Sequence, residues 1–439
     1  MNKPCPKYKP SGVEWLGDVP EHWETWKLAH GFDLVGSGTT PPSDELEWYD
    51  GTIPWITTSE LRENVISTTE KFVTKEAVNK FSALKIFPKG SVAIAMYGAT
   101  IGRLGIFGIE ATTNQACCVM NGGHIFEVKY VYYWMQAFKD SIILLASGGG
   151  QPNISQDKIK SLKIPCPTVS EQQAIATFLD RETGRIDALI AKKQRLLELL
   201  AEQLTALISR AVTKGLDASV KLKPSGVEWL GGLPEHWEVK KVRYLFAFRS
   251  GGTPSTENQE YWEGNIPWVS SKDMKTFLIE DSEDHINETA IRESATNIIP
   301  ANTLVVVMRS GILIHSIPAS VLLKDMSINQ DIKAFLPLVK LSSIYFARFI
   351  EGFQKQLLTE WRKEGATVES LDMELIKNFQ TILPPLPEQQ AIAAFLDRET
   401  AKIDALSAKV TTVIERLKEY RTALISSAVT GKIDVREAV

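Results

Sequence analysis

The chain repeats itself once, and this repeat limits its possible folds more than any other feature of the sequence. Residues 9–24 read KPSGVEWLGDVPEHWE, and residues 223–238 read KPSGVEWLGGLPEHWE. A second match pairs EQQAIATFLDRET from residue 171 with EQQAIAAFLDRET from residue 388, and a third pairs TALISRAVT with TALISSAVT. The 439 residues are enough for two to four domains of roughly 100–200 residues each, and the repeat predicts two similar units.

Each copy ends in a segment with the pattern of a long helix. Apolar residues recur near heptad spacing, and Gly215 and Gly431 mark the expected C-terminal ends. We expect Ser170 to cap the first helix in a capping box with Gln173, and Pro387 to lie in the first turn of the second. A lone helix of about 40 residues, about 60 Å long, could not bury its apolar stripe, so we predict that the two helices pack together. The alternative is that each helix covers only its own module.

The segments between the repeated ends have diverged and resemble mixed α+β modules. Short β-rich runs such as 91–96, 101–107 and 304–308 alternate with turns, whereas 128–145 and 341–358 have helical patterns. The predicted fold class is α+β. Two modules with twisted sheets are expected to be related by a pseudo-twofold axis and separated by two long helices, which pack as an antiparallel coiled coil.

Weaker repeats remain at the start of each divergent segment. SGTTP in the first copy corresponds to SGGTP in the second, and an IPW tripeptide follows in both. Trp55 and Trp268 of these tripeptides are interpreted as core residues, because they occupy matching framework positions. The expected domains are 1–168 and 216–385 for the two modules, 169–215 and 386–432 for the helices, and 433–439 for a tail.

Composition excludes several classes of protein. Lys plus Arg is 49 and Asp plus Glu is 53, which excludes a uniformly basic protein that coats nucleic acid but allows a local basic face. No apolar run is long enough for a transmembrane helix, and no signal peptide is recognisable, so we expect a cytoplasmic protein without membrane contact. The four cysteines and six histidines lack zinc spacing, and the cysteines are interpreted as reduced thiols.

The sequence contains no complete catalytic motif. The glycines between residues 98 and 108 lack nucleotide-binding spacing, and no P-loop, G-x-S-x-G or H-E-x-x-H element occurs. The Asn-Pro-Pro-aromatic element of amino-methyltransferases is absent, and an acidic-x-Lys pattern occurs four times, which makes it uninformative. His22 and His236 belong to the repeated PEHWE and are interpreted as structural rather than as bases.

The divergent segments instead carry loops rich in hydrogen-bond donors. Residues 147–156 read SGGGQPNISQ, in which glycines allow close approach of a partner, although an ordinary surface loop is the alternative. Tyr97, Arg103 and Arg309 follow matching strand patterns in the two copies. Asn and Gln can read adenine and Arg can read guanine, at about 1–3 kcal/mol of discrimination for each good pair.

This order of segments resembles the specificity subunit of type I restriction-modification systems. The resemblance rests on the repeated EQQ-A-I-A-x-F-L-D-x-E-T helix and on the SGxTP and IPW motifs that open each module, and it spans residues 9–434. It implies two target recognition domains, each reading half of a bipartite, asymmetric site in double-stranded DNA. It also implies that the helices dock two modification (methyltransferase) subunits, which methylate adenine, and that restriction subunits join them.

The same resemblance implies a chain that is not an enzyme and binds no cofactor itself. S-adenosylmethionine, magnesium and ATP are expected on the partner subunits. Two alternatives remain open from the residues. One is a scaffold that joins partner proteins without DNA, and the other is a methyltransferase or nuclease in its own right.

The family's G-x-Q-x-x-I-S loop is present at residues 149–155, whereas the second copy has GATVESL at 365–371 and lacks the Gln. The predicted DNA-contacting residues are Ser37, Thr39, Thr58, Ser59, Tyr97, Thr100, Arg103, Gln151, Asn153, Ser155, Ser250, Thr253, Ser270, Lys272, Arg309, Ser310 and Thr367. The helix residues assigned to partner binding are Ile175, Leu179, Ile186, Leu189, Ile392, Leu396, Ile403 and Leu406.

Overall fold

The computed structural model describes residues 7–147, 152–363, 365 and 368–435. The chain forms two compact units: unit 1 combines Met1–Gln194 with Thr411–Val439, and unit 2 is Arg195–Val410. The division falls inside the two long helices, α5 (Val169–Lys214) and α10 (Leu386–Val429), so each unit holds one segment of each helix. The units therefore differ from the sequential domains expected from the sequence.

Unit 1 is built around a five-stranded sheet with the order β4-β11-β8-β9-β6 and a smaller sheet with the order β10-β5-β7. Both sheets are mixed, because β6 pairs with β9, and β5 with β10, in parallel. The strands are β1 (Tyr8–Pro10), β2 (Asp18–Pro20), β3 (Glu24–Lys27), β4 (Leu34–Gly36), β5 (Tyr49–Ile56), β6 (Asn64–Ile66), β7 (Phe72–Val73), β8 (Val92–Ala95), β9 (Leu104–Phe107), β10 (Thr112–Thr113), β11 (Cys117–Asn121) and β12 (Lys163–Cys166).

Unit 2 repeats this topology with one more strand in its smaller sheet, although its sequence has diverged. Its five-stranded sheet has the order β16-β24-β21-β22-β18, and its smaller sheet has the order β19-β17-β23-β20. The strands are β13 (Leu222–Pro224), β14 (Gly232–Pro234), β15 (Glu238–Lys241), β16 (Phe246–Ser250), β17 (Ile266–Val269), β18 (Leu278–Ile279), β19 (Asp284–Ile286), β20 (Ile298–Ile299), β21 (Leu304–Val307), β22 (Ala319–Leu322), β23 (Met326–Ile328), β24 (Ile332–Pro337) and β25 (Gln380–Leu383).

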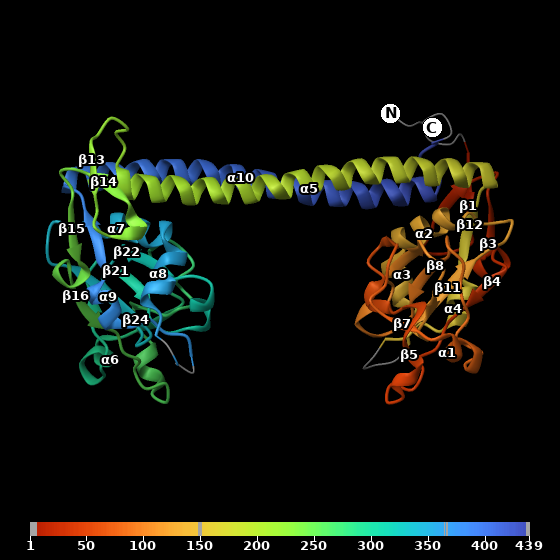
Figure 1. The fold of residues 1–439 in the computed structure, drawn as a ribbon, viewed down its shortest axis with the longest axis horizontal. Coiled ribbons are helices and arrows are strands. Elements are labelled where there is room, and N and C mark those ends of the chain that lie inside the picture. Colours follow the sequence, from red (N-terminus) through yellow and green to blue (C-terminus); the bar gives the residue numbers. More distant parts are fainter. Residues whose placement is uncertain (1–6, 148–151, 364, 366–367, 436–439) are drawn as a thin grey trace. The chain divides into compact units, whose positions relative to one another are not determined.

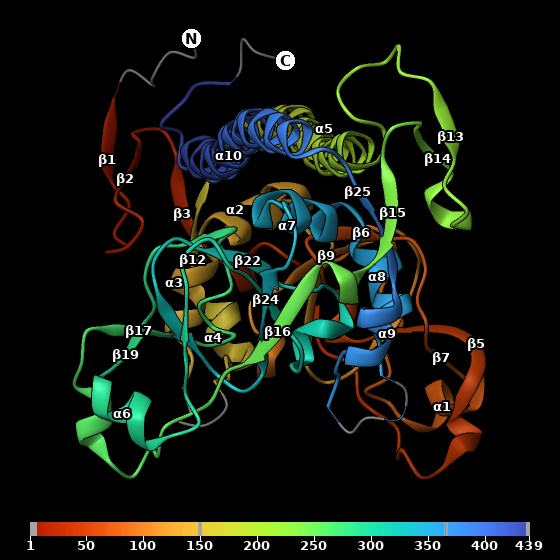
Figure 2. The same cartoon turned by 90° about the vertical axis from the view of Figure 1, so that its left-hand side faces the viewer.

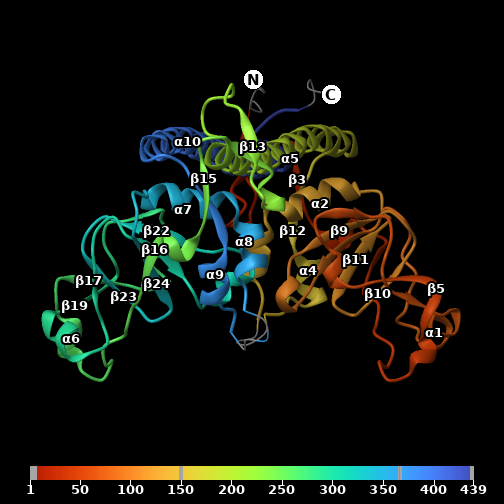
Figure 3. The same cartoon turned by 60° about the vertical axis from the view of Figure 1, so that its left-hand side comes forward.

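Short helices surround these sheets in the same order in both units. Unit 1 has α1 (Lys75–Lys80), α2 (Val128–Ala137), α3 (Lys139–Leu144) and α4 (Gln156–Ser161). Unit 2 has α6 (Glu288–Glu293), α7 (Ser343–Gly352), α8 (Gln354–Trp361) and α9 (Met373–Asn378). In unit 1, α2 lies between α5 and the five-stranded sheet, whereas β5 and α1 lie on the side away from α5 (Figures 1 and 3). In unit 2, α7 takes the corresponding place beneath α10 (Figure 2).

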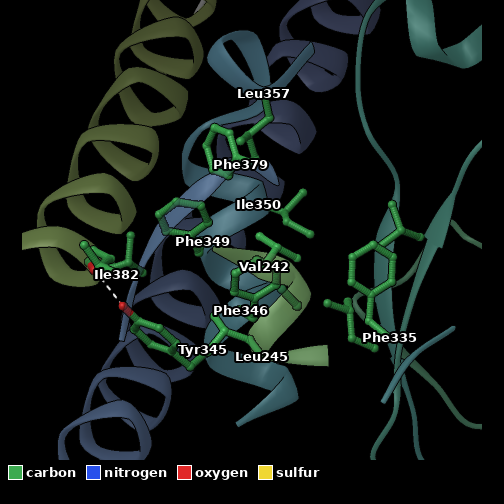
Figure 4. Packing of buried hydrophobic residues seen from close by; sticks show 14 of the residues in the cluster. Val242, Leu245, Phe335, Tyr345, Phe346, Phe349, Ile350, Leu357, Phe379 and Ile382 are labelled. Carbon is green, nitrogen blue, oxygen red and sulfur yellow. Dashed lines mark hydrogen bonds between the residues drawn. The ribbon is translucent and has the colours of Figure 1, made fainter. Parts of the chain in front are cut away.

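The alternation of side chains along a strand explains the layers. In β21, Leu304 and Val306 belong to the core that includes α7, whereas Val305 and Val307 belong to a second core under the smaller sheet. All four are fully buried, which explains why this strand is a continuous apolar run. Figure 4 shows the first core, in which aromatic side chains of α7 face Phe335 of the sheet.

This core also includes both long helices. Ile208 and Val212 of α5 and Ile392 and Leu396 of α10 pack in one cluster with the body of unit 2. The idea that each helix covers only its own module is therefore wrong, because the end of α5 packs against the following module. The buried hydroxyl of Tyr345 donates to the Val212 carbonyl at 2.8 Å (Figure 4).

The two helix segments run antiparallel within each unit. In unit 1, the Tyr130 hydroxyl donates both to the Pro165 carbonyl, just before α5, and to the Val429 carbonyl at the end of α10. Arg421 of α10 forms a bidentate pair with Asp187 of α5, with N–O distances of 2.9 and 3.2 Å. The predicted α+β fold with antiparallel long helices is confirmed at this level.

The predicted cap of α5 was wrong by two residues. Thr168, not Ser170, caps the helix: its Oγ1 accepts from Glu171 N at 3.3 Å, and Glu171 Oε2 accepts from Thr168 N at 3.2 Å. Gly215 and Gly431 end the two helices as predicted, with φ of 74° and 70°.

The EQQ motif joins the long helix to the body in both copies. Gln172 is fully buried: its Oε1 accepts from Glu127 N at 2.8 Å, and its Nε2 donates to the carbonyls of Ile125 and Pro167 at 2.8 and 2.9 Å. Gln389 makes the corresponding three bonds in unit 2.

The glutamate that begins the EQQ motif binds the histidine of the repeated PEHWE segment in each copy. Glu171 pairs with His22 at 2.8 Å, and Glu388 pairs with His236 at 2.6 Å. The structural interpretation of these histidines therefore agrees with their contacts.

Candidate nucleic-acid interface

The loops that carry most of the predicted contact residues meet at one edge of the sheets in each unit. In unit 1, β4 and β8 end where β11 begins, because Gly36 pairs with Val119 and Ala95 with Cys117. The Asn114 N–H donates to the Ile56 carbonyl at the end of β5, which brings the smaller sheet to the same edge. We call this the loop edge. It comprises residues 37–41, 57–60, 96–103, 113–116, 147 and 152–155 in unit 1, and 250–254, 270–273, 308–315, 328–331 and 368–372 in unit 2.

Polar residues form a series of side-chain and backbone contacts across the loop edge of unit 1. Thr40 Oγ1 donates to Gln115 Oε1 at 2.5 Å. Burial raises the pKa of Tyr97, and a hydrogen bond with the Gln115 side chain partly offsets this effect. The backbone of Tyr97 is bridged to that of Asn153, which is exposed and whose N–H and carbonyl pair with Ser147. A threonine, an amide, a phenol and a second amide therefore lie next to one another.

Unit 2 has the same arrangement with different residues at two of the four positions. Thr253 Oγ1 donates to Gln330 Oε1, as Thr40 does to Gln115. Arg309 takes the place of Tyr97, and Ser370 takes the place of Asn153, because these two residues form the corresponding backbone bridge. The two loop edges therefore share the Thr–Gln pair and differ in the residues next to it.

Arg309 is exposed, and it forms no side-chain hydrogen bond or ion pair with any residue that the structure describes. Arg103 of unit 1 is half-buried and also has no such partner within the described ranges. Both guanidinium groups can therefore donate to a ligand without breaking an internal bond.

Other predicted residues serve the fold in ways that the sequence did not indicate. The Ser155 hydroxyl caps α4 by accepting from Lys158 N at 3.2 Å, and the Ser310 hydroxyl accepts from Ile312 N at 3.4 Å. Ser270 is 8% exposed, and its hydroxyl donates to Asp273 at 3.0 Å. These hydroxyls are already engaged within the chain.

Lys272 is poorly placed to attract a phosphate. Its ammonium lies 2.8 Å from Asp284 and 3.3 Å from Glu283, and the hydrogen bond to Asp284 raises its pKa. The two carboxylates outweigh the single positive charge. The corresponding residue of unit 1 is Ser59, whose hydroxyl pairs with Thr57 at 2.8 Å.

The remaining predicted residues lie at the loop edge with few polar contacts. Ser37 and Thr39 follow β4, and the Thr39 carbonyl accepts from the Trp55 indole at 3.2 Å. Ser250 accepts from Lys333 at 2.6 Å. Thr58 and Thr100 are half-buried in single helical turns, at Thr58–Glu60 and Gly98–Thr100. Gln151 and Thr367 lie outside the described residues.

Three residues of this edge were not predicted from the sequence: Thr40, Gln115 and Gln330. The detectable signal was an Asn-Gln dipeptide at 114–115 that recurs at 329–330, where the flanking sequences differ. In the SGTTP motif, the residue equivalent to Thr253 is Thr40, because both hydroxyls donate to the matching glutamine.

Most helix residues assigned to partner binding are covered by the chain itself. Ile175, Leu179, Ile186, Ile392 and Leu396 are buried, so a partner would reach them only after local unfolding. Ile403 is half-buried. Leu189 and Leu406, which occupy matching positions of α5 and α10, are 41% and 45% exposed. Of the eight assigned residues, only Leu189 and Leu406 present an exposed apolar side chain to solvent.

Within the described part of the chain, no three His, Cys, Asp or Glu side chains are grouped so as to hold a metal ion. Cys117 and Cys118 are buried free thiols, and Cys166 is half-buried and free. None of the described helices is long and apolar enough to cross a membrane.

Two copies of one α+β module, each packed on segments of the same two long helices and each with a polar loop edge, define a duplicated two-module protein. The chain belongs to the family of type I restriction-modification specificity subunits. The family model described as "Type I restriction modification DNA specificity domain" matches residues 20–199 and 234–416. Subunits of this family are non-catalytic.

Two relatives illustrate the similarity. The type I restriction enzyme EcoR124I/EcoR124II specificity subunit of Escherichia coli is 32% identical over 297 residues, which is 67% of each chain. The MjaIX specificity subunit of Methanocaldococcus jannaschii is 26% identical over 430 residues, which is 96% of each chain.

Solved structures share the fold. A chain from a study of complex assembly and conformational transition of the type I R-M system gives a TM-score of 0.73 at 15% identity and covers 94% of this chain and 99% of that one. The HsdS subunit from Thermoanaerobacter tengcongensis gives 0.57 at 14% identity, with 94% and 98% covered.

Proposed function

We propose that this chain is the sequence-reading subunit of a type I restriction-modification complex. Each loop edge contacts one half of a bipartite, asymmetric site in double-stranded DNA. The modification and restriction subunits that join this chain bind the cofactors S-adenosylmethionine, magnesium and ATP. Family membership and the names of the relatives support this assignment.

The observation that carries the proposal is the equivalence of the two loop edges. The strand order, the Thr–Gln pair and the backbone bridge recur, whereas Tyr97 and Asn153 are replaced by Arg309 and Ser370. Two modules that recognise different base sequences need the same backbone framework but different hydrogen-bond donors and acceptors. The free guanidinium of Arg309 suits a guanine, which accepts two hydrogen bonds from Arg in the major groove.

Binding of DNA variants by the assembled complex tests this proposal. The chain is purified with its modification subunits, and the dissociation constant is measured by fluorescence anisotropy for a duplex that carries the site methylated in the host. Each base pair is then changed in turn. The Arg309→Ala complex should lose discrimination of about 1–3 kcal/mol at one position of one half-site. Asn153→Ala should affect only the other half. Equal effects on both halves, or a wild type without sequence preference, would contradict the proposal.

Leu189 and Leu406 support the docking of two copies of one partner. They occupy matching positions of the repeated helix, and each leaves an apolar side chain in solvent. Leu189→Glu and Leu406→Glu should each leave one modification subunit bound, and the double variant none, as measured by size exclusion with light scattering. Retention of two subunits by the double variant would contradict this docking.

A further inference from the structure

A threonine and a glutamine occupy the same place in both loop edges, although most residues around them differ. In unit 1 the pair is Thr40 and Gln115, and in unit 2 it is Thr253 and Gln330. Both glutamines are exposed and lie in the turn that leads into β11 in unit 1 or ends just before β24 in unit 2. An exposed polar pair that persists between divergent modules calls for a shared role.

The backbone presets the position of each threonine. A Cβ added to Gly38 would lie 1.7 Å from the Thr113 carbonyl oxygen, and one added to Gly251 would lie 2.0 Å from that of Ile328. Only glycine allows this approach, which presses the SGxTP loop onto the strand that enters the glutamine turn. The indole of Trp268 donates to the Gly252 carbonyl at 2.9 Å and holds the same loop.

The internal bonds leave each glutamine with donor capacity. Its Oε1 accepts from the threonine, so the amide is fixed, and its Nε2 carries two N–H groups. In unit 1 the Gln115 side chain bonds Tyr97, and in unit 2 Nε2 of Gln330 donates to Asp331 at 3.4 Å. One N–H of each amide has no partner among the residues that the structure describes. A ligand that binds this N–H would have to be a hydrogen-bond acceptor.

We propose that Gln115 and Gln330 donate this N–H to phosphate oxygens of the DNA backbone and so position the two modules on the duplex. The inference rests on the proposed function. If the half-sites differ, a donor kept in both modules must contact what the half-sites share, and every half-site offers backbone phosphates. The residues that contact the bases are then Tyr97, Asn153, Arg309 and Ser370.

The test uses the complex with its modification subunits and two duplexes, one with the host's methylated site and one of unrelated sequence. Gln115→Ala and Gln330→Ala should each weaken binding to both duplexes by the same factor, about tenfold for one hydrogen bond to a charged acceptor. Because glutamine is neutral, the slope of log Kd against log salt should not change. Gln173→Ala, an exposed glutamine at the start of α5, is the matched control.

A scan with single methylphosphonate linkages, which lack the charged oxygen, identifies the acceptor. One linkage should weaken the wild type and leave the Gln115→Ala complex unaffected. Thr40→Val keeps the amide but frees it, and should cause a smaller loss that is equal on both duplexes.

Loss of discrimination at one base pair with unchanged binding of the unrelated duplex would overturn the inference, because the glutamine would then read a base. Unchanged binding of both duplexes would overturn it as well. A wild-type complex that binds both duplexes equally would instead refute the proposed function and leave the phosphate contact measurable.

Discussion

Replacement of Gln172 by leucine should destabilise the packing of α5 against the body of unit 1. Leucine fills a similar volume but removes the hydrogen bonds that Gln172 makes with the buried Pro167 carbonyl and with two part-buried groups, the N–H of Glu127 and the carbonyl of Ile125. A buried group that loses its partner costs about 1–3 kcal/mol, and a part-buried group costs less because water can reach it, so the loss should be about 2–5 kcal/mol. This is a large part of the roughly 5–15 kcal/mol by which a domain is stable.

Urea denaturation measures this loss, and hydrogen exchange followed by mass spectrometry locates it in α2. Gln173→Leu is the control, because this neighbouring side chain is exposed and its replacement should change the stability by less than about 0.5 kcal/mol. Gln389→Leu should have the same effect on α7 in unit 2, where three equivalent bonds are lost. Equal stability of Gln172→Leu and its control would refute the view that the motif acts as a structural lock.

Three further changes test other contacts. Tyr130→Phe removes a hydroxyl from two buried carbonyls and should lower the free energy of unfolding by about 1–2 kcal/mol in urea titrations, with no change in secondary structure by circular dichroism. Burial raises the pKa of Glu171, but hydrogen bonds led by that from His22 lower it overall. The pair therefore stabilises the fold above the carboxyl's ordinary pKa of 4.5 and is lost as the pH falls through the lowered value, so Glu171→Gln should make the urea midpoint less sensitive to acid between pH 6 and pH 3. Gly38→Ala should displace its loop from the Thr113 carbonyl and weaken DNA binding at least tenfold, with the long helices still formed by circular dichroism; unchanged binding would contradict the preset loop.

The long helices were predictable because their signals are regular over many turns. Heptad spacing and the glycines Gly215 and Gly431 defined two elements that the structure contains, and only the cap moved, from Ser170 to Thr168. Two hydroxyl residues in neighbouring positions offer equivalent caps to a sequence pattern. The position of Glu171, which also binds His22, favours the earlier one.

The sheets were harder to predict because their strands are short and their pairing is non-local. The parallel pairs β6–β9 and β18–β22 involve three and two residues on each strand, too few for a periodic signal. The helical patterns at 128–145 and 341–358 each form two helices rather than one. The break falls at Phe138 and Phe353, which pack against Trp15 of the β1–β2 hairpin and Trp229 of the β13–β14 hairpin. Such tertiary anchors leave no local trace in the sequence.

At the loop edge, residue chemistry indicated the right loops but not the state of each side chain. Ser270 and Lys272 are donors by type, yet Asp273 and Asp284 already bind them. Gln115 does not lie in a glycine-rich loop. Its importance becomes visible when the contacts of the two modules are compared, because Gln330 makes the matching bond.

The central claim is that each unit reads one half of the site, and mapping of methylated bases across the genome tests it most directly. A strain that supplies the modification subunits expresses either the wild-type chain or Arg309→Ala, and modified positions are read by single-molecule sequencing. The wild type should give one bipartite motif with unlike halves, and the variant should relax one half while the other stays unchanged. A palindromic motif, or a variant that alters both halves, would contradict the account.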